Sequence, residues 1–169
     1  KDKDITINDV YNNIDKIYFG YEIIEPRFNG YNSECNNING YSNIFNIPIQ
    51  YLIVDLCWTG GIIFDKSKYI SLNTGNEYKS LDENIMRNCN VKLYINDILK
   101  SQGKGNDVLG SPFIVLTWLY NFLKNNYNET LKPNDLIATG TMTGCCFMEK
   151  NDVANTIFDG FGDVTFKFT

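Results

Sequence analysis

Residues 91–119 read VKLYINDILKSQGKGNDVLGSPFIVLTWL and carry the strongest folding signals of the chain. The first apolar residues of this stretch alternate with polar ones, at Val91, Leu93 and Ile95. Asn96 and Asp97 follow them, and both residue types tolerate the left-handed backbone of a tight turn. A short turn after such alternation is typical of a β-hairpin, which we expect over residues 88–101.

The remainder of the stretch predicts a helix over residues 112–126. Ser111 can accept a hydrogen bond from the first turn, and Pro112 stands at the first helical position, where no backbone N–H is needed. One face of the helix carries four large apolar side chains: Val115, Trp118, Leu119 and Phe122. The glycine-rich loop before it, residues 101–105 (SQGKG), lacks the G-x-x-x-x-G-K-S/T spacing of a phosphate-binding loop.

The segments outside this stretch supply further helices and strands. Thr6 and Asp9 fit a capping box that opens a helix over residues 7–18. The other predicted elements are a strand over 18–25, a polar loop over 29–43, a helix over 44–58, and strands over 62–64, 136–139 and 164–168. Because we find no internal repeat and no linker, we expect one α+β domain over residues 1–169.

The composition excludes several classes of function. The chain has 169 residues, no histidine, and 20 acidic against 15 basic residues, which gives a net charge of −5. Without histidine it cannot contain a Ser-His-Asp triad or an imidazole metal site, so a metal would be held by carboxylates, carbonyls or thiolates. The acidic balance argues against nucleic acid as a partner. No stretch approaches the roughly 20 apolar residues of a membrane span, so we expect no membrane association.

The five cysteines are odd in number and form no C-x-x-C pair, so they indicate neither a disulfide framework nor a zinc ribbon. We expect reduced thiols in a cytoplasmic protein. Cys145 and Cys146 are adjacent and could form a redox or metal pair, although adjacent cysteines rarely meet disulfide geometry. Asp2 and Asp4 could ligate a divalent ion, or could lie in a solvated terminus, which is the commoner case.

Glu22 is the first candidate functional residue, because it lies inside an apolar strand between Tyr21 and Ile23. A carboxylate buried there would be costly unless a cation or a hydrogen-bond network compensated it. The alternative is structural, with Glu22 facing solvent at a sheet edge or pairing with Arg27. The residues alone leave both alternatives open.

The second candidate is the loop Gly140-Thr141-Met142-Thr143-Gly144, which follows a predicted strand. Backbone N–H groups exposed between two glycines could cradle a carboxylate or a phosphate. The alternative is a tight turn in which the threonine hydroxyls bond their own backbone.

Four segments resemble motifs of one family, in order along the chain. Residues 21–28 (YEIIEPRF) resemble A-I/L-E-I/L-V-D-S-R-Y/I, and residues 96–119 resemble a hairpin, a G-x-x-V-L-G-x-P loop and a helix bearing A/T-W-L. Residues 131–144 (LKPNDLIATGTMTG) resemble L-x-x-G-D-x-x-x-T-G-S/T-x-T-G, with Asn134 where glycine is usual, and the closing FDGFGDVTFKF resembles G-x-G-x-V-x-V/F-x-F. This pattern resembles the fumarylacetoacetate hydrolase superfamily, in its branch of 2-keto-4-pentenoate (2-hydroxypenta-2,4-dienoate) hydratases and 4-oxalocrotonate decarboxylases.

The resemblance implies a mixed β-roll with peripheral helices, assembled through dimers into a homo-oligomer. It also implies one Mg²⁺ or Mn²⁺ ion held by three carboxylates, with Glu22 matching the third of them, and a small oxo-acid as substrate. The metal would act on the oxo group as a Lewis acid. Gly140, Thr141 and Thr143 match the loop that lines the family's substrate site, where amides and hydroxyls can meet the substrate carboxylate.

The chain also departs from the family's pattern. Asp55 matches the aspartate of an A-D-N-A-S segment that reads VDLCW here (residues 54–58), and we expect it to be catalytic. Leu56 and Trp58 replace an amide and a hydroxyl, which would make a polar pocket wall apolar. The family's other two metal carboxylates, an E-x-E pair, and a lysine of the hydratases precede the helix predicted over residues 7–18 and are absent here. We therefore expect the chain to lack an N-terminal portion and to be inactive alone.

The leading hypothesis is a metal-dependent lyase, a hydratase or decarboxylase that acts on a small 2-oxo or 2-hydroxy-dienoic acid. The alternative is a non-catalytic homologue of the same fold that serves as a binding or assembly subunit, which Leu56, Trp58 and the absent E-x-E pair favour. A third possibility is a sibling activity, the cleavage of oxaloacetate or an acylpyruvate. The sequence does not choose the substrate, because substrate selection depends on the shape of the pocket.

Overall fold

The computed structural model describes residues 3–25, 59–71 and 83–169. Its contacts divide the chain into two compact units. The larger unit comprises Lys1–Phe19 and Phe64–Thr169, and the smaller unit comprises Gly20–Ile63. The loop predicted over 29–43 and the helix predicted over 44–58 lie outside the described residues.

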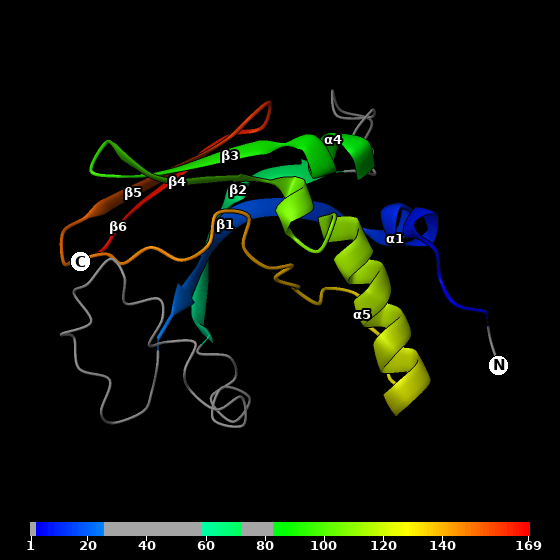
Figure 1. The fold of residues 1–169 in the computed structure, drawn as a ribbon. Coiled ribbons are helices and arrows are strands. Elements are labelled where there is room, and N and C mark those ends of the chain that lie inside the picture. The colour runs from blue at the N-terminus through cyan, green and yellow to red at the C-terminus, as the bar shows by residue number, and fades with distance from the viewer. Residues whose placement is uncertain (1–2, 26–58, 72–82) are drawn as a thin grey trace. The chain divides into compact units, whose positions relative to one another are not determined.

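A four-stranded antiparallel sheet is the largest β element of the larger unit (Figure 1). Its strands follow the order β4-β3-β5-β6, and their bounds are Ile98–Lys104, Asn90–Ile95, Val153–Phe158 and Gly162–Lys167. The hairpin β3–β4 confirms the one predicted over 88–101, and its turn residues Asn96 and Asp97 have φ values of 51° and 63°. The final strand was predicted over 164–168 and begins slightly earlier, whereas β5 was not predicted.

The helix α5 spans Pro112–Tyr127 and confirms the helix predicted over 112–126. The Ser111 hydroxyl accepts a hydrogen bond from the Phe113 N–H at 3.2 Å, as expected for an N-cap. However, the helix face that carries Trp118 and Phe122 does not pack on the core, since these side chains are 57% and 37% exposed. Phe113 and Leu116 pack there instead.

The helix α1 spans Ile7–Asn13 and is shorter than the helix predicted over 7–18. Its capping box is confirmed: the Thr6 N–H donates to the Asp9 carboxylate at 2.8 Å, and the Asp9 N–H donates to the Thr6 hydroxyl at 3.3 Å. After Asn13 the backbone becomes extended, and strand β1 (Lys16–Ile24) begins. The β-branched and aromatic residues of KIYFGYEII favour a strand over continuation of the helix.

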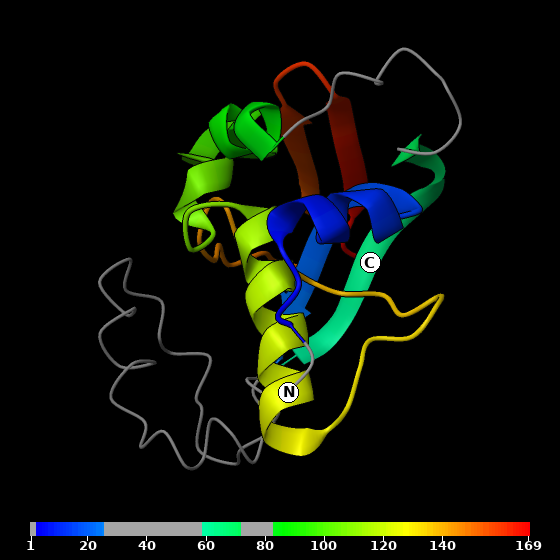
Figure 2. The same ribbon diagram turned by 90° about the vertical axis from the view of Figure 1, so that its right-hand side faces the viewer.

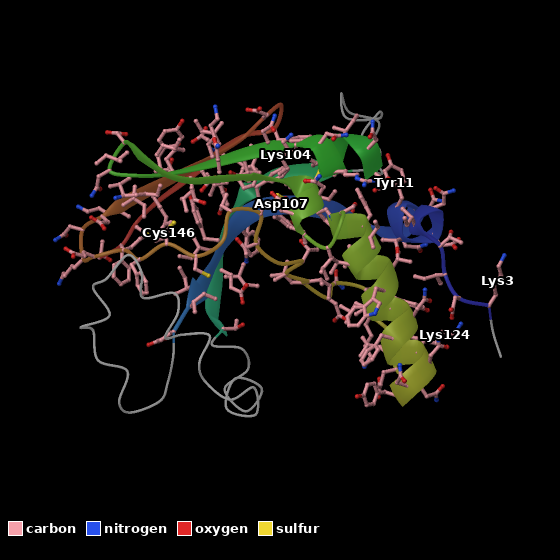
Figure 3. The ribbon with its side chains drawn as sticks, viewed as in Figure 1. Lys3, Tyr11, Lys104, Asp107, Lys124 and Cys146 are labelled. Carbon is pink, nitrogen blue, oxygen red and sulfur yellow. The ribbon has the colours of Figure 1, made fainter. Side chains whose placement is uncertain are left out.

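The segment before α1 lies along α5, as Figures 2 and 3 show. The Asn121 side chain bonds the backbone of Ile5 twice, because its amide donates to the Ile5 carbonyl and its oxygen accepts from the Ile5 N–H, each at 3.0 Å. Lys124 Nζ donates to the Lys3 carbonyl at 3.1 Å, and the Asn125 side chain donates to the Asp4 carboxylate at 2.9 Å. Asp4 therefore has a structural contact.

The hydrophobic core of the larger unit is shared by α1, α5, strand β2 (Thr59–Ser71) and the short helix α4 (Glu83–Asn88), which was not predicted. Its buried members are Val10, Ile70, Met86 and Phe113. Phe19 joins the core to the sheet, because its ring lies 4.5 Å from that of Phe158.

Strand β2 pairs with β1 and is much longer than the strand predicted over 62–64. Gly60 and Gly61 lie inside the strand, just before the segment predicted from the sequence. A Cβ at Gly60 would lie 2.9 Å from the Glu25 Cβ and 3.2 Å from the Ile23 carbonyl oxygen. Glycine here permits close approach of the two strands and does not interrupt one.

The strand predicted over 136–139 is wrong, since this segment has no strand structure. Leu136 is 53% exposed, so its apolar side chain does not mark a buried strand face. A short apolar segment becomes a strand only where a neighbouring backbone is present to pair with it.

The pH dependence of stability can be predicted at Asp152, which ties the hairpin turn to the start of β5. Its carboxylate accepts from the Glu149 N–H at 2.8 Å and from the Asn96 amide at 2.7 Å. These hydrogen bonds hold the pKa of Asp152 below its ordinary value of 3.8. The stabilisation is therefore present above pH 3.8 and is lost as the pH falls through the lower pKa of the folded state.

We predict that Asp152→Asn lowers the midpoint of urea unfolding at neutral pH, and that this difference shrinks as the pH falls below the ordinary pKa. Asn96→Gly is the matched control, because glycine tolerates the positive φ of the turn but lacks the amide that bonds Asp152. It should remove part of the same pH dependence. An Asp152→Asn variant that differs from the natural chain equally at every pH would contradict the assignment.

Candidate functional site

The loop Gly140–Gly144 has the backbone of a tight turn. Its glycines have φ values of 110° and 73°, in the region that favours glycine. The Thr143 N–H donates to the Thr141 hydroxyl at 3.2 Å, and the Thr141 hydroxyl donates to the Gly144 carbonyl at 3.2 Å. The loop therefore stabilises its own shape, which is the structural alternative that the sequence left open. Gly140 and Thr141 remain exposed and Thr143 is half-buried, so a ligand can reach the loop.

Strand β4 anchors this loop. The Ser101 hydroxyl donates a hydrogen bond to the Thr143 carbonyl. A Cβ at Gly103 would lie 1.8 Å from the Met142 carbonyl oxygen, so the two backbones are in direct contact. Ser101 and Gly103 belong to the SQGKG segment, which lacks phosphate-binding spacing. In the structure this segment holds the Gly140–Gly144 loop in place.

The anchoring residues were missed by sequence reasoning, although a signal for one of them was present. An isolated glycine inside a strand often marks the close approach of another backbone, and Gly103 is such a glycine. Nothing in the local pattern distinguishes Ser101 from any other strand serine.

Glu22 lies near the C-terminal end of β1, where Tyr21 and Ile23 are half-buried and Glu22 itself is exposed. Its Oε1 accepts a hydrogen bond from the Thr59 hydroxyl on β2 at 2.7 Å. This bond orients the carboxylate at the surface of the smaller unit. Arg27, the pairing partner considered from the sequence, lies outside the described residues, as does Asp55.

The predicted site residues are therefore only partly brought together. Gly140, Thr141 and Thr143 form one loop in the larger unit, whereas Glu22 belongs to the smaller unit. A divalent cation such as Mg²⁺ prefers oxygen ligands, and the exposed Glu22 carboxylate, oriented by Thr59, fits as one of them. Within residues 3–25, 59–71 and 83–169, no group of three or more His, Cys, Asp or Glu side chains is placed to hold a metal ion.

We predict that Gly103→Ala destabilises the protein by about 1–3 kcal/mol or more, because an added methyl group must displace backbone atoms of the loop. Ser101→Ala should cost about 0.5–1.5 kcal/mol, the usual contribution of one hydrogen bond. Urea unfolding monitored by tryptophan fluorescence measures both changes.

Gly61→Ala is the matched control for Gly103→Ala. Gly61 also lies inside a strand, but a Cβ there would meet nothing within 4 Å. The control should leave stability nearly unchanged or raise it. Equal losses at Gly61 and Gly103 would mean that the contact with Met142 has no special importance.

The family model described as fumarylacetoacetate (FAA) hydrolase C-terminal matches residues 55–169. No curated protein matches the sequence. Two solved structures of 4-oxalocrotonate decarboxylase from Pseudomonas putida G7 are similar, one complexed with magnesium and adipate (TM-score 0.74) and one with calcium and acetate (TM-score 0.72).

Each of these structures shares 21% sequence identity with the chain, and the match covers 96% of this chain and 52% of that chain. The chain thus spans about half the length of the solved structures it matches. At this identity the likeness shows the fold, and the α+β architecture predicted from the sequence is confirmed. None of the helices in the described residues is long and apolar enough to cross a membrane.

Proposed function

The chain belongs to the fumarylacetoacetate hydrolase family, and from this premise we propose that it forms part of a metal-dependent lyase acting on a small 2-oxo or 2-hydroxy-dienoic acid. The proposal is supported by the fold shared with a decarboxylase that was solved with magnesium and a dicarboxylate. The single observation in this chain that carries it is the exposed Glu22 carboxylate, which is oriented by the Thr59 hydroxyl.

In the proposed site Glu22 holds Mg²⁺, or Mn²⁺ in its place, through its carboxylate. When bound, such an ion supplies Lewis-acid polarisation of a carbonyl oxygen. Thr59 fixes the direction of the carboxylate and removes the rotational freedom that would weaken binding. The two further carboxylates implied by the resemblance would come from outside the described residues, in the full-length protein upstream of Lys1.

The loop Gly140–Gly144 has the role of binding the substrate carboxylate. Thr141 is exposed and offers its hydroxyl, and the glycines leave the backbone unshielded. Ser101 and Gly103 hold the loop against β4, so that it need not be ordered when substrate arrives. Asp55 is proposed as the catalytic group that moves a proton.

Hydration, decarboxylation and carbon–carbon cleavage remain distinct versions of this proposal. They differ in whether water is consumed, carbon dioxide is released or the carbon chain is cut. A panel of 2-oxo and 2-hydroxy-dienoic acids, oxaloacetate and acylpyruvates, followed by loss of enol absorbance and by release of carbon dioxide, separates the three. The full-length protein would act in the cytoplasm, where thiols such as those of this chain stay reduced, and would form a homo-oligomer built from dimers, as the family resemblance implies.

The second candidate is a non-catalytic homologue that keeps the fold as a binding or assembly subunit. Leu56 and Trp58, where the family has an amide and a hydroxyl, favour it. A protein of this kind would turn over no member of the panel and would bind no divalent ion at Glu22.

We predict that Glu22→Gln in the full-length protein abolishes Mn²⁺ binding or weakens it by more than tenfold, because an amide lacks the charge of the carboxylate. Thr59→Val should weaken binding by about 10–100-fold, the usual effect of losing a hydrogen bond to a metal ligand. Titration followed by the electron paramagnetic resonance of free Mn²⁺ measures both affinities without any assumption about substrate.

Glu25→Gln is the matched control, since Glu25 is an exposed glutamate that lies next to the end of the same strand. The Mn²⁺ affinity of this variant should equal that of the natural protein. Equal Mn²⁺ binding by the Glu22 and Glu25 variants would refute the proposed metal site and leave the non-catalytic candidate.

A further inference from the structure

One face of α5 carries large apolar side chains that are exposed to solvent. The rings of Trp118 and Phe122 stack with their centroids 5.0 Å apart, and Phe122 meets the ring of Tyr127 at 5.7 Å. Trp118 also borders an open hollow of about 200 Å³ near the start of the helix. We call this surface the apolar stripe; its members are Leu109, Ile114, Val115, Trp118, Phe122 and Tyr127.

Leu109 is held in the stripe by a strained backbone. Its φ is 47°, in the left-handed region that is unfavourable for leucine, and its side chain is 77% exposed. Hydrogen bonds on both sides fix this turn, because the Gly110 N–H donates to the Asn106 carbonyl and the Ser111 N–H donates to the Val108 carbonyl, each at 2.9 Å. Such strain concentrates at functional contacts, and a contiguous exposed apolar surface marks an interaction site. The stripe is therefore interpreted as an interface.

The segment before α1 lies directly beside the stripe. Asn121, which bonds the backbone of Ile5, is three residues after Trp118. Asn125, which bonds the side chain of the residue before Ile5, is three residues after Phe122. Residues three or four apart are neighbours on a helix surface, so the row of α5 that binds the segment adjoins the row of exposed aromatic rings.

The segment runs antiparallel to α5. Ile5 is held at Asn121, whereas Lys3 is held further along the helix, where Lys124 Nζ donates to its carbonyl at 3.1 Å (Figure 3). Moving toward the N-terminus of the chain thus leads toward the C-terminal end of α5 and Tyr127. Polypeptide joined before Lys3 is therefore delivered to the end of the stripe.

The chain spans about half the length of the solved structures that it matches. We propose that, in the full-length protein, the polypeptide preceding Lys1 runs back along α5 and covers the apolar stripe with apolar side chains of its own. From Ile114 to Tyr127 the stripe is about 20 Å long, which about six extended or about thirteen helical residues span. This inference rests on the full-length protein proposed above but not on its lyase activity.

Hydroxyl-radical footprinting of the full-length protein and of the 169-residue chain tests the proposal, with oxidation located by mass spectrometry. In the full-length protein Trp118 and Tyr127 should be oxidised at least about fivefold more slowly, since side chains at the centre of an interface lose nearly all their exposure. Phe147 is the matched control, because it is an aromatic side chain with 66% exposure that lies outside α5. Its oxidation rate should be the same in both proteins.

The protection should persist when the full-length protein is diluted, because the covering segment belongs to the same chain. Protection that weakens on dilution would assign the stripe to a second copy, and protection already present in the 169-residue chain would assign it to other residues of that chain. Either result would overturn the proposal. Equal oxidation of Trp118 in the two proteins, or an equal drop at Phe147, would contradict it as well.

Leu109→Gly provides a second test, because the two proteins should respond differently. Glycine relieves the strain of the positive φ, so in the 169-residue chain the midpoint of urea unfolding should rise or stay the same. In the full-length protein the midpoint should fall, since the covering segment loses its contact with the leucine side chain.

Asn134→Gly is the matched control for Leu109→Gly. Asn134 is exposed, has a φ of 74° and lies outside the stripe, so this substitution should shift both midpoints in the same direction. A full-length Leu109→Gly protein whose midpoint does not fall would count against the proposed cover.

Discussion

The contact between Gly103 and the Met142 carbonyl is the constraint on which the candidate substrate loop depends. A β-carbon at position 103 would overlap the carbonyl oxygen, so glycine is required for the backbones of β4 and the loop to touch. Ser101 adds a hydrogen bond to the Thr143 carbonyl, and the two contacts together hold the consecutive loop residues Met142 and Thr143 against the strand. The loop is thus positioned by backbone contact, which is stiffer than positioning by long side chains.

Local signals predicted the elements that are stabilised locally. The hairpin β3–β4 and the capping box of α1 each depend on residues within a few positions of one another, and both were found where the sequence placed them. Strand β5 was missed because its buried residues include Ala154 and Thr156, which are weak apolar signals, and because its partner β3 lies far away along the chain. Pairing between distant segments leaves no local mark.

The sequence predicted which residues form the candidate site, but not which residues orient them. Family resemblance selected Glu22 and the Gly140–Gly144 loop, whereas Thr59 and Ser101, which orient them, became visible only in three dimensions. These hydroxyls are ordinary strand residues in the sequence, and only the approach of a second backbone gives them a role. The same limit applies to α5, where periodicity identified an apolar face but could not decide which face the core would cover.

The side chain of Asn121 has the same donor and acceptor as a peptide group, and it pairs with Ile5 as a neighbouring strand would. Such a pair is bidentate: opening one of its hydrogen bonds exposes the other to water. The segment before α1 therefore dissociates from α5 in one step and not one hydrogen bond at a time. The first residues of the described chain and the C-terminal half of α5 form one cooperative unit, even though more than a hundred residues separate them in the sequence.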